Sequence, residues 1–243
     1  MRNWMKRIFA GLLAAVCVLS ASACMIVGGS SSDSSGSESA GGVPAELTDK
    51  NTGLVYKATA DGTALEVSGY IGTAAEVFIP DTYEGFDVVA VYNRAFYQNT
   101  TITQVSLGDN VVEIKDRAFF QCTSLTSIFW GEGIQIIGAS AFANCSSLTT
   151  KFPEGLLELR TSAFANCVKL PPIVHVSRQS QKTYSVIYIP TTVDVIQMGV
   201  FSGIKDKTEY TCVLWYPKRG AHWDGDFHCG IRVHPYANLD YLA

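Results

Sequence analysis

Apolar residues recur at fixed distances through the middle of this chain. A phenylalanine preceded by a small or aliphatic residue marks each unit, and successive marks lie 23, 23, 22 and 37 residues apart. An aliphatic residue stands five positions before every mark, and another stands three positions before that one. The marks are Phe96, Phe119, Phe142, Phe164 and Phe201. A unit this short cannot bury its own apolar face, so the spacing predicts an array of stacked coils that share one core.

Alternating apolar pairs upstream of the marks predict one β-strand in each coil. Both members of a pair should face inward, and the residue between them should face outward. The pairs are Val77/Ile79, Val105/Leu107, Ile128/Trp130 and Ile187/Ile189, while the unit that contains Phe152 is one residue short. The aliphatic pair before each mark predicts a second short extended segment or bend. "SAFANC" (140–145) should then turn the corner through a single helical or 3₁₀ turn.

The outward residue of each pair gives a candidate binding stripe. In order these residues are Phe78, Ser106, Phe129, Lys151 and Tyr188. Three of the five are aromatic, and in a stacked sheet they should form one row at about 4.8 Å per coil. Aromatic residues are enriched at interfaces, which favours a recognition surface. The alternative is that these aromatics only reflect strand preference, or that a cap or an inserted hairpin covers them.

The segment "CTSLTSIFWGEGIQIIGASAFANC" (122–145) resembles the bacterial leucine-rich repeats of the BspA-like type. Their unit reads approximately C-x-x-L-x-x-I-x-I-P-x-x-V-x-x-I-G-x-x-A-F, and the match covers residues 77–203. The proline is kept in three units and replaced by Gly108 and Gly131 in two others. The resemblance implies a right-handed leucine-rich-repeat solenoid, strand-dominated and of the α/β horseshoe-like class. It also implies display on the bacterial surface, a role in adhesion or protein binding, no catalytic residues and no cofactor.

The N-terminus predicts export. Basic residues precede an apolar run at 8–19 and small residues at 20–23, so residues 1–23 are interpreted as a signal peptide. "ASAC" (21–24) is similar to a lipobox, which would lipidate Cys24 and anchor the chain to the membrane; release by an ordinary signal peptidase is the alternative. Residues 28–42 are rich in Ser and Gly, so residues 24–52 are expected to be the anchor cysteine and a flexible tether.

The two ends of the array should be closed by β-rich caps. Residues 53–76 read as a β-hairpin around Asp61 and Gly62, the N-terminal cap. The array itself is expected over 77–203 in about five coils, with an inserted hairpin near 171–189. Residues 204–243 are expected to form the C-terminal cap.

Cys122, Cys145 and Cys167 occupy one repeat position, where another unit has Asn99. In this repeat type the position faces inward, so small buried side chains with weak thiol donors are expected. A soft-metal site is the alternative, although zinc requires four converging ligands rather than a row. Cys212 and Cys229 lie in the predicted C-terminal cap and could form a disulfide in an exported protein.

Charge and candidate chemistry narrow the function classes. Three of the 18 Lys and Arg residues lie in the leader, which leaves 15 against 22 Asp and Glu, so nucleic acid is not an expected partner. The 222–234 segment holds the only catalytic-looking cluster, which matches no metal motif: His222, Asp224, Asp226, His228, Cys229 and His234. The leading hypothesis is a non-enzymatic surface binding module for an extracellular protein or glycan. The alternatives are a self-associating structural envelope protein and a small metal-dependent enzyme.

Overall fold

The computed structural model describes residues 43–170 and 187–204 in full. Of the rest it describes the backbone of residues 173–176, 183–186, 211–215, 222–223 and 232–233. These residues form strands and turns and contain no helix, so none of them forms a helix able to cross a membrane. They belong to one compact unit, Gly41–Ala243.

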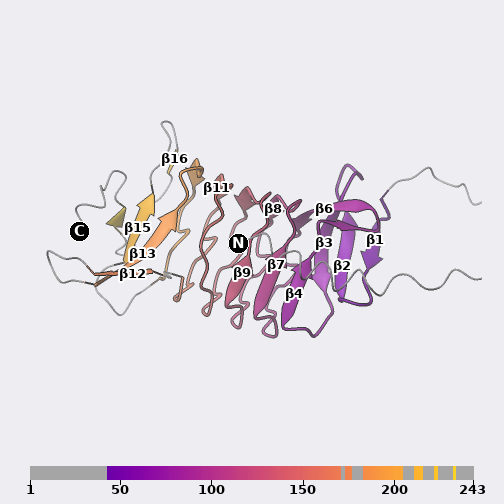
Figure 1. The fold of residues 1–243 in the computed structure, drawn as a ribbon, viewed down its shortest axis with the longest axis horizontal. Helices are drawn as coiled ribbons and strands as arrows, with labels where there is room; N and C mark the ends of the chain where they lie inside the picture. The colour runs from indigo at the N-terminus through magenta and orange to yellow at the C-terminus, as the bar shows by residue number, and fades with distance from the viewer. Residues whose placement is uncertain are drawn as a thin grey trace, which may run out of the picture. The chain divides into compact units, whose positions relative to one another are not determined.

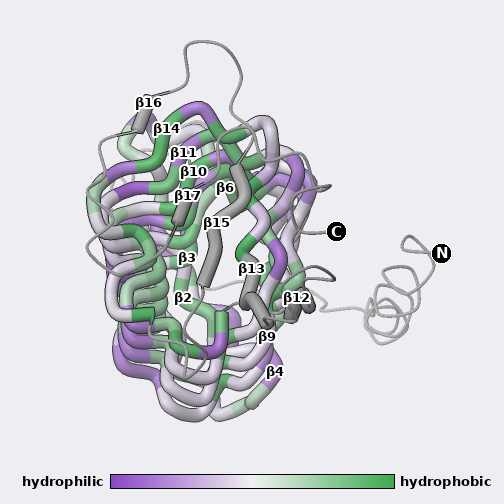
Figure 2. Tube along the Cα trace, turned by 90° about the vertical axis from the view of Figure 1, so that its left-hand side faces the viewer, coloured by the Kyte–Doolittle hydropathy of each residue, from purple (hydrophilic) through white to green (hydrophobic). Residues whose placement is uncertain are grey.

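The coils of the array contribute parallel strands to two separate sheets (Figure 1), although the coil of Lys151 has no strand in the first. The first sheet contains β4 (Glu76–Ile79), β7 (Gln104–Leu107) and β9 (Ser127–Phe129). The second runs through β6 (Phe86–Val91), β8 (Glu113–Ile114), β10 (Ile136–Ile137), β11 (Glu158–Leu159) and β14 (Val195–Ile196). Seen along the stack, β6, β10, β11 and β14 follow one side of the coils and β4 and β9 another (Figure 2). The predicted first strand and second extended segment are therefore both confirmed.

The corner around each phenylalanine mark is a run of β-turns, so the prediction of a helical or 3₁₀ turn was wrong. In one coil the N–H groups of Phe120 and Cys122 donate to the carbonyls of Arg117 and Phe119, three residues earlier. The N–H of Phe119, however, donates to Ala141 in the next coil at 2.8 Å. Beyond its first turn, a helix uses every N–H within its own segment. Stacking between coils takes alternate N–H groups, so a helical corner cannot form.

Left-handed residues make these corners possible. Every marked turn has two residues with positive φ, four positions apart, and they fall where type II turns require them. They are Arg94, Gln98, Arg117, Gln121, Ser140, Asn144, Ser162, Asn166, Gly199 and Gly203. Three hydrogen bonds cross each of the four junctions between marked turns, always from an N–H of the earlier coil to a carbonyl of the later coil.

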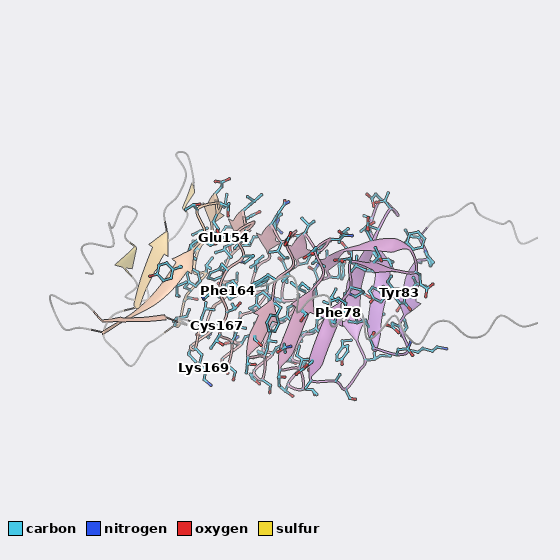
Figure 3. The ribbon with its side chains drawn as sticks, viewed as in Figure 1. Phe78, Tyr83, Glu154, Phe164, Cys167 and Lys169 are labelled. Carbon is cyan, nitrogen blue, oxygen red and sulfur yellow. The ribbon has the colours of Figure 1, made fainter. Side chains whose placement is uncertain are left out.

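The phenylalanine marks form a stacked column inside the array. Neighbouring rings lie 4.8, 5.1, 5.2 and 6.3 Å apart between centroids, and their planes are tilted by at most 21°. All five side chains are buried, as predicted. Offset stacking of this kind adds to the apolar area that the rings remove from water. Figure 3 marks Phe164 of this column together with Cys167, which ends the same turn.

Antiparallel strands cover the N-terminal end of the column. β1 (Glu46–Thr48), β2 (Leu54–Ala58) and β3 (Leu65–Tyr70) pair in order, and β3 then pairs parallel with β6. β2 and β3 form a hairpin around Asp61 and Gly62, while β1 lies within the stretch expected to be tether. The extra residues of the first unit form a second hairpin, β5 (Thr82–Tyr83) with β6, and Tyr83 stacks on the buried Tyr56 at 4.4 Å.

The C-terminal strands continue the parallel stacking. β12 (Ile173–Val176) pairs antiparallel with β13 (Thr183–Ile189), which agrees with the hairpin expected near 171–189. β13, β15 (Thr211–Trp215) and β17 (Arg232–Val233) are parallel neighbours, and β16 (His222–Trp223) extends the second sheet beyond β14. Beyond residue 203, therefore, parallel strands extend both the second sheet and the separate sheet of β13.

A candidate binding face on the first sheet

The outer face of β4, β7 and β9 presents an aromatic row. Phe78 is in register with Ser106, and Ser106 with Phe129. Strand alternation turns their neighbours Val77 and Ile79 into the core, so the row itself points away from it. Phe78 is 58% exposed and Phe129 is 54% exposed, whereas Ser106 is half-buried. Figure 3 labels Phe78 on β4.

Polar residues flank this row on both sides. Glu76, Gln104 and Ser127 form a second in-register row on the same face, two residues earlier on each strand. The loops that follow the strands carry exposed acidic residues at one repeat position, three residues after each member of the aromatic row. These are Asp81, Asp109 and Glu132. The two exposed rings therefore have hydrogen-bonding groups on their own face and acidic side chains in the loops that follow the strands.

Contacts between coils hold the acidic loops in place. The Asp81 carboxylate accepts the backbone N–H of Asp109, and the Asp109 carboxylate accepts that of Glu132 at 2.9 Å. A Cβ at Gly131 would overlap the carbonyl of Gly108. This close approach accounts for glycine at the two units where the repeat pattern has proline.

The structure brings together three of the five predicted stripe residues. Lys151 is exposed, but its coil is one residue short and forms no strand there. The indole N–H of Trp130 donates to the Lys151 carbonyl at 2.7 Å, a bond that a neighbouring strand would otherwise supply. Tyr188 is 36% exposed on β13, whose described partners are β12 and β15. No described strand pairing joins Tyr188 to the row of Phe78.

The second sheet carries a charged network instead of an aromatic row. Glu66 on β3 is buried and pairs with Lys115 at 2.5 Å and with Lys57 at 3.6 Å. The Lys57 ammonium also lies 3.1 Å from the centre of the Tyr92 ring. Burying an unpaired carboxylate costs several kcal/mol because it loses its hydration. The two lysines offset that cost for Glu66. Glu66 is paired with both Lys57 and Lys115, so none of the three is a free acid–base group.

The cysteine row is a structural feature of the core. Cys122, Cys145 and Cys167 are buried, and each thiol donates to a phenylalanine carbonyl of the preceding coil at 3.0 Å. Burial raises the pKa of the Cys167 thiol to about 12 and raises the pKa of Cys145 well above its ordinary value. Both thiols therefore stay protonated, which suits a donor and disfavours a metal ligand. Within the described residues no group of three or more His, Cys, Asp and Glu side chains is placed to hold a metal.

Several predicted sites lie outside the described residues. Cys24 and Cys229 are among them, and only the strand backbone of Cys212 is described. In the 222–234 cluster the structure describes the backbone of His222 on β16 and none of the other candidate ligands. Lipidation of Cys24, the disulfide and the metal cluster remain predictions.

Sequence reasoning missed an aromatic pair on the turn face. Tyr97 and Phe120 each follow a phenylalanine mark directly and stack at 5.2 Å, with Tyr97 40% exposed. The signal was available, because the same position holds alanine in the next two units. The acidic flank of the aromatic row was also missed, although its three residues share one repeat position.

Comparisons with known proteins agree with this architecture. The family model described as "BspA type Leucine rich repeat region" matches residues 89–208 in six copies. A leucine-rich repeat protein of T. pallidum is 27% identical, with a TM-score of 0.58 over 69% of this chain and 70% of its own.

Two further solved structures are more distant. A leucine-rich cell surface protein of Faecalibacterium prausnitzii is 20% identical, with a TM-score of 0.54 over 75% of this chain and 51% of its own. The pneumococcal vaccine antigen PcpA is 15% identical, with a TM-score of 0.51 over 69% and 36%. This chain therefore spans about half of the length of the first of these structures and about a third of the length of the second. No curated protein matches the chain.

Proposed function

We propose that this chain, whose residues 89–208 match the BspA-type leucine-rich repeat model, is a binding protein displayed on a bacterial surface. The observation that carries the proposal is the in-register row of Phe78, Ser106 and Phe129 on the outer face of the first sheet. Two rings, each more than half exposed, lie on one face of the first sheet that the described residues leave uncovered. Such contact area is what interfaces use most, since aromatic side chains give large apolar area at low entropic cost.

The N-terminal segment supports display outside the cell. The leader at 1–23, Cys24 and the Ser/Gly-rich stretch at 28–42 are the parts that an anchored, tethered protein requires. A fatty-acid probe should label the wild-type protein, and Cys24→Ala should abolish the label and release or misprocess the chain. Unlabelled wild-type protein found only in the medium would refute the anchor and leave secretion.

The binding role is tested with purified full chain immobilised on a biosensor. It is presented with purified extracellular matrix proteins and a glycan panel, first as wild type and then as the Phe78→Ser/Phe129→Ser double variant. We expect at least one partner to bind the wild type and to lose at least tenfold in affinity on the double variant. Tyr97→Ser is the matched control, because it removes an exposed ring from a different face.

Two results would favour the other functions. Concentration-dependent assembly of the wild type in sedimentation velocity, with no partner retained, would indicate a structural envelope protein. Stoichiometric metal in the purified chain, lost on His228→Ala, would indicate the metal-dependent enzyme. Either result without a retained partner would refute the binding proposal.

A further inference from the structure

We infer that the aromatic row of the first sheet takes a proline-rich segment in the polyproline II conformation that also carries basic side chains. This inference rests on the proposed function and names the chemistry of its partner. It follows from three properties of the face: the spacing of the rings, the hydrogen-bonding groups beside them and the charge around them.

The ring spacing matches one turn of polyproline II. Phe78 and Phe129 lie two strands apart in register, which is about 9.6 Å at the usual separation of about 4.8 Å between strands. A polyproline II helix has three residues per turn and a rise of about 3.1 Å, so its turn measures about 9.3 Å. A segment that runs along the array can therefore place every third residue on a ring. Side chains on one face of an extended strand repeat at about 6.8 Å instead, which does not match.

The residue between the rings fits the same ligand. Ser106 is short and half-buried, so the row reads large, small, large. The two residues of the ligand between consecutive contacts then pass over Ser106 without a clash. A pyrrolidine ring is apolar and its backbone is already ordered, so stacking it on phenylalanine costs little conformational entropy.

The polar row supplies partners for the ligand backbone. Polyproline II has no internal hydrogen bonds, so its carbonyls face outward and need donors. Gln104 and Ser127 lie on the same face as the rings, two residues away along their strands. A side-chain amide and a hydroxyl can both donate to carbonyls. The ligand would therefore exchange water for these donors as its proline rings bury the phenylalanines.

Charge adds the basic component. Glu76 lies on one side of the rings, and Asp81, Asp109 and Glu132 lie on the other. The chain beyond its leader carries 15 basic against 22 acidic residues, and near the rings Lys151 of the next coil is outnumbered by these four acidic side chains. A ligand with Lys or Arg between its prolines gains from both flanks, whereas an acidic ligand is repelled.

The experiment measures fluorescence anisotropy of labelled peptides with the purified full chain. The probe is (Pro-Pro-Arg)₄, and the matched peptide (Gly-Gly-Arg)₄ keeps the charge but loses the polyproline II preference. We expect the proline peptide to bind at least tenfold more tightly than the glycine peptide. Phe78→Ser and Phe129→Ser should each weaken it at least tenfold, while Tyr97→Ser should change it less than twofold. Thermal melts of each variant confirm that the fold is retained.

Three results would overturn the inference. The first is equal binding of the two peptides, which would mean charge alone. The second is binding of cello- or chito-oligosaccharides in place of peptide, which would mean a glycan ligand. The third is absence of peptide binding while a matrix protein still binds the wild type and not the double variant. In that last case the binding role stands and only the ligand class is wrong; if no partner binds either, both proposals fail.

Discussion

Replacing Phe142 by alanine tests the stacked column at its centre. The ring is fully buried and lies 5.1 Å from Phe119, 5.2 Å from Phe164 and 5.9 Å from the edge-on Trp130. Truncating a buried phenylalanine to alanine generally costs about 3–5 kcal/mol, because the transfer free energy of the ring is lost and a cavity is left behind. Rings on both sides prevent the site from collapsing, so we expect the upper half of that range.

The assay is urea unfolding followed by circular dichroism, with the change read from the midpoint at constant slope. Phe129→Ala is the control, because it makes the same chemical change on a ring that is 54% exposed. Its expected cost is below about 1 kcal/mol, as for most surface substitutions. A loss at Phe142 no larger than that of the control would show that the marks do not form the core.

Three further predictions follow from other contacts. Because burial keeps Cys145 and Cys167 protonated, a thiol reagent at pH 8 should modify them only after unfolding. Stability should also fall as pH rises above about 8.5, where the unfolded thiols ionise and the folded ones do not; rapid labelling of native protein would contradict this. Gly199→Ala, at φ +66, should lower stability by about 1–2 kcal/mol, whereas Gly69→Ala, whose Cβ would meet only ordinary contacts, should not. Glu66→Gln should cost about 1–3 kcal/mol because it leaves its two lysines without a buried partner, and an unchanged melting temperature would show that the network is dispensable.

The sequence predicted the parts of the fold that depend on apolar spacing. The five phenylalanine marks and the pairs such as Val105/Leu107 are buried as expected, because a fixed repeat leaves one way to stack the coils. The turn corner could not be predicted in the same way. Arg117 and Gln121 have left-handed φ there, and neither residue type signals that conformation. The signal lay in later units, which have Asn144, Asn166, Gly199 and Gly203 at these repeat positions.

The candidate face was likewise predicted only in part from the sequence. Phe78 and Phe129 follow from strand alternation alone, and their exposure agrees with it. Lys151 does not join them, because one missing residue removes the strand that would have presented it. In the shortened coil the Trp130 indole donates to the Lys151 carbonyl in place of a neighbouring strand. No local sequence pattern predicts this contact.

The one-way hydrogen bonds of the turn face have an electrical consequence. All three bonds at each of the four junctions run from an earlier N–H to a later carbonyl, so these peptide dipoles add instead of cancelling. Each peptide contributes about 3.5 D, as in an α-helix. The turn side of the array therefore has a lengthwise polarity, positive toward the coil of Phe201 and negative toward the coil of Phe96. Every coil added by duplication would lengthen this dipole, although the fold contains no helix among its described residues.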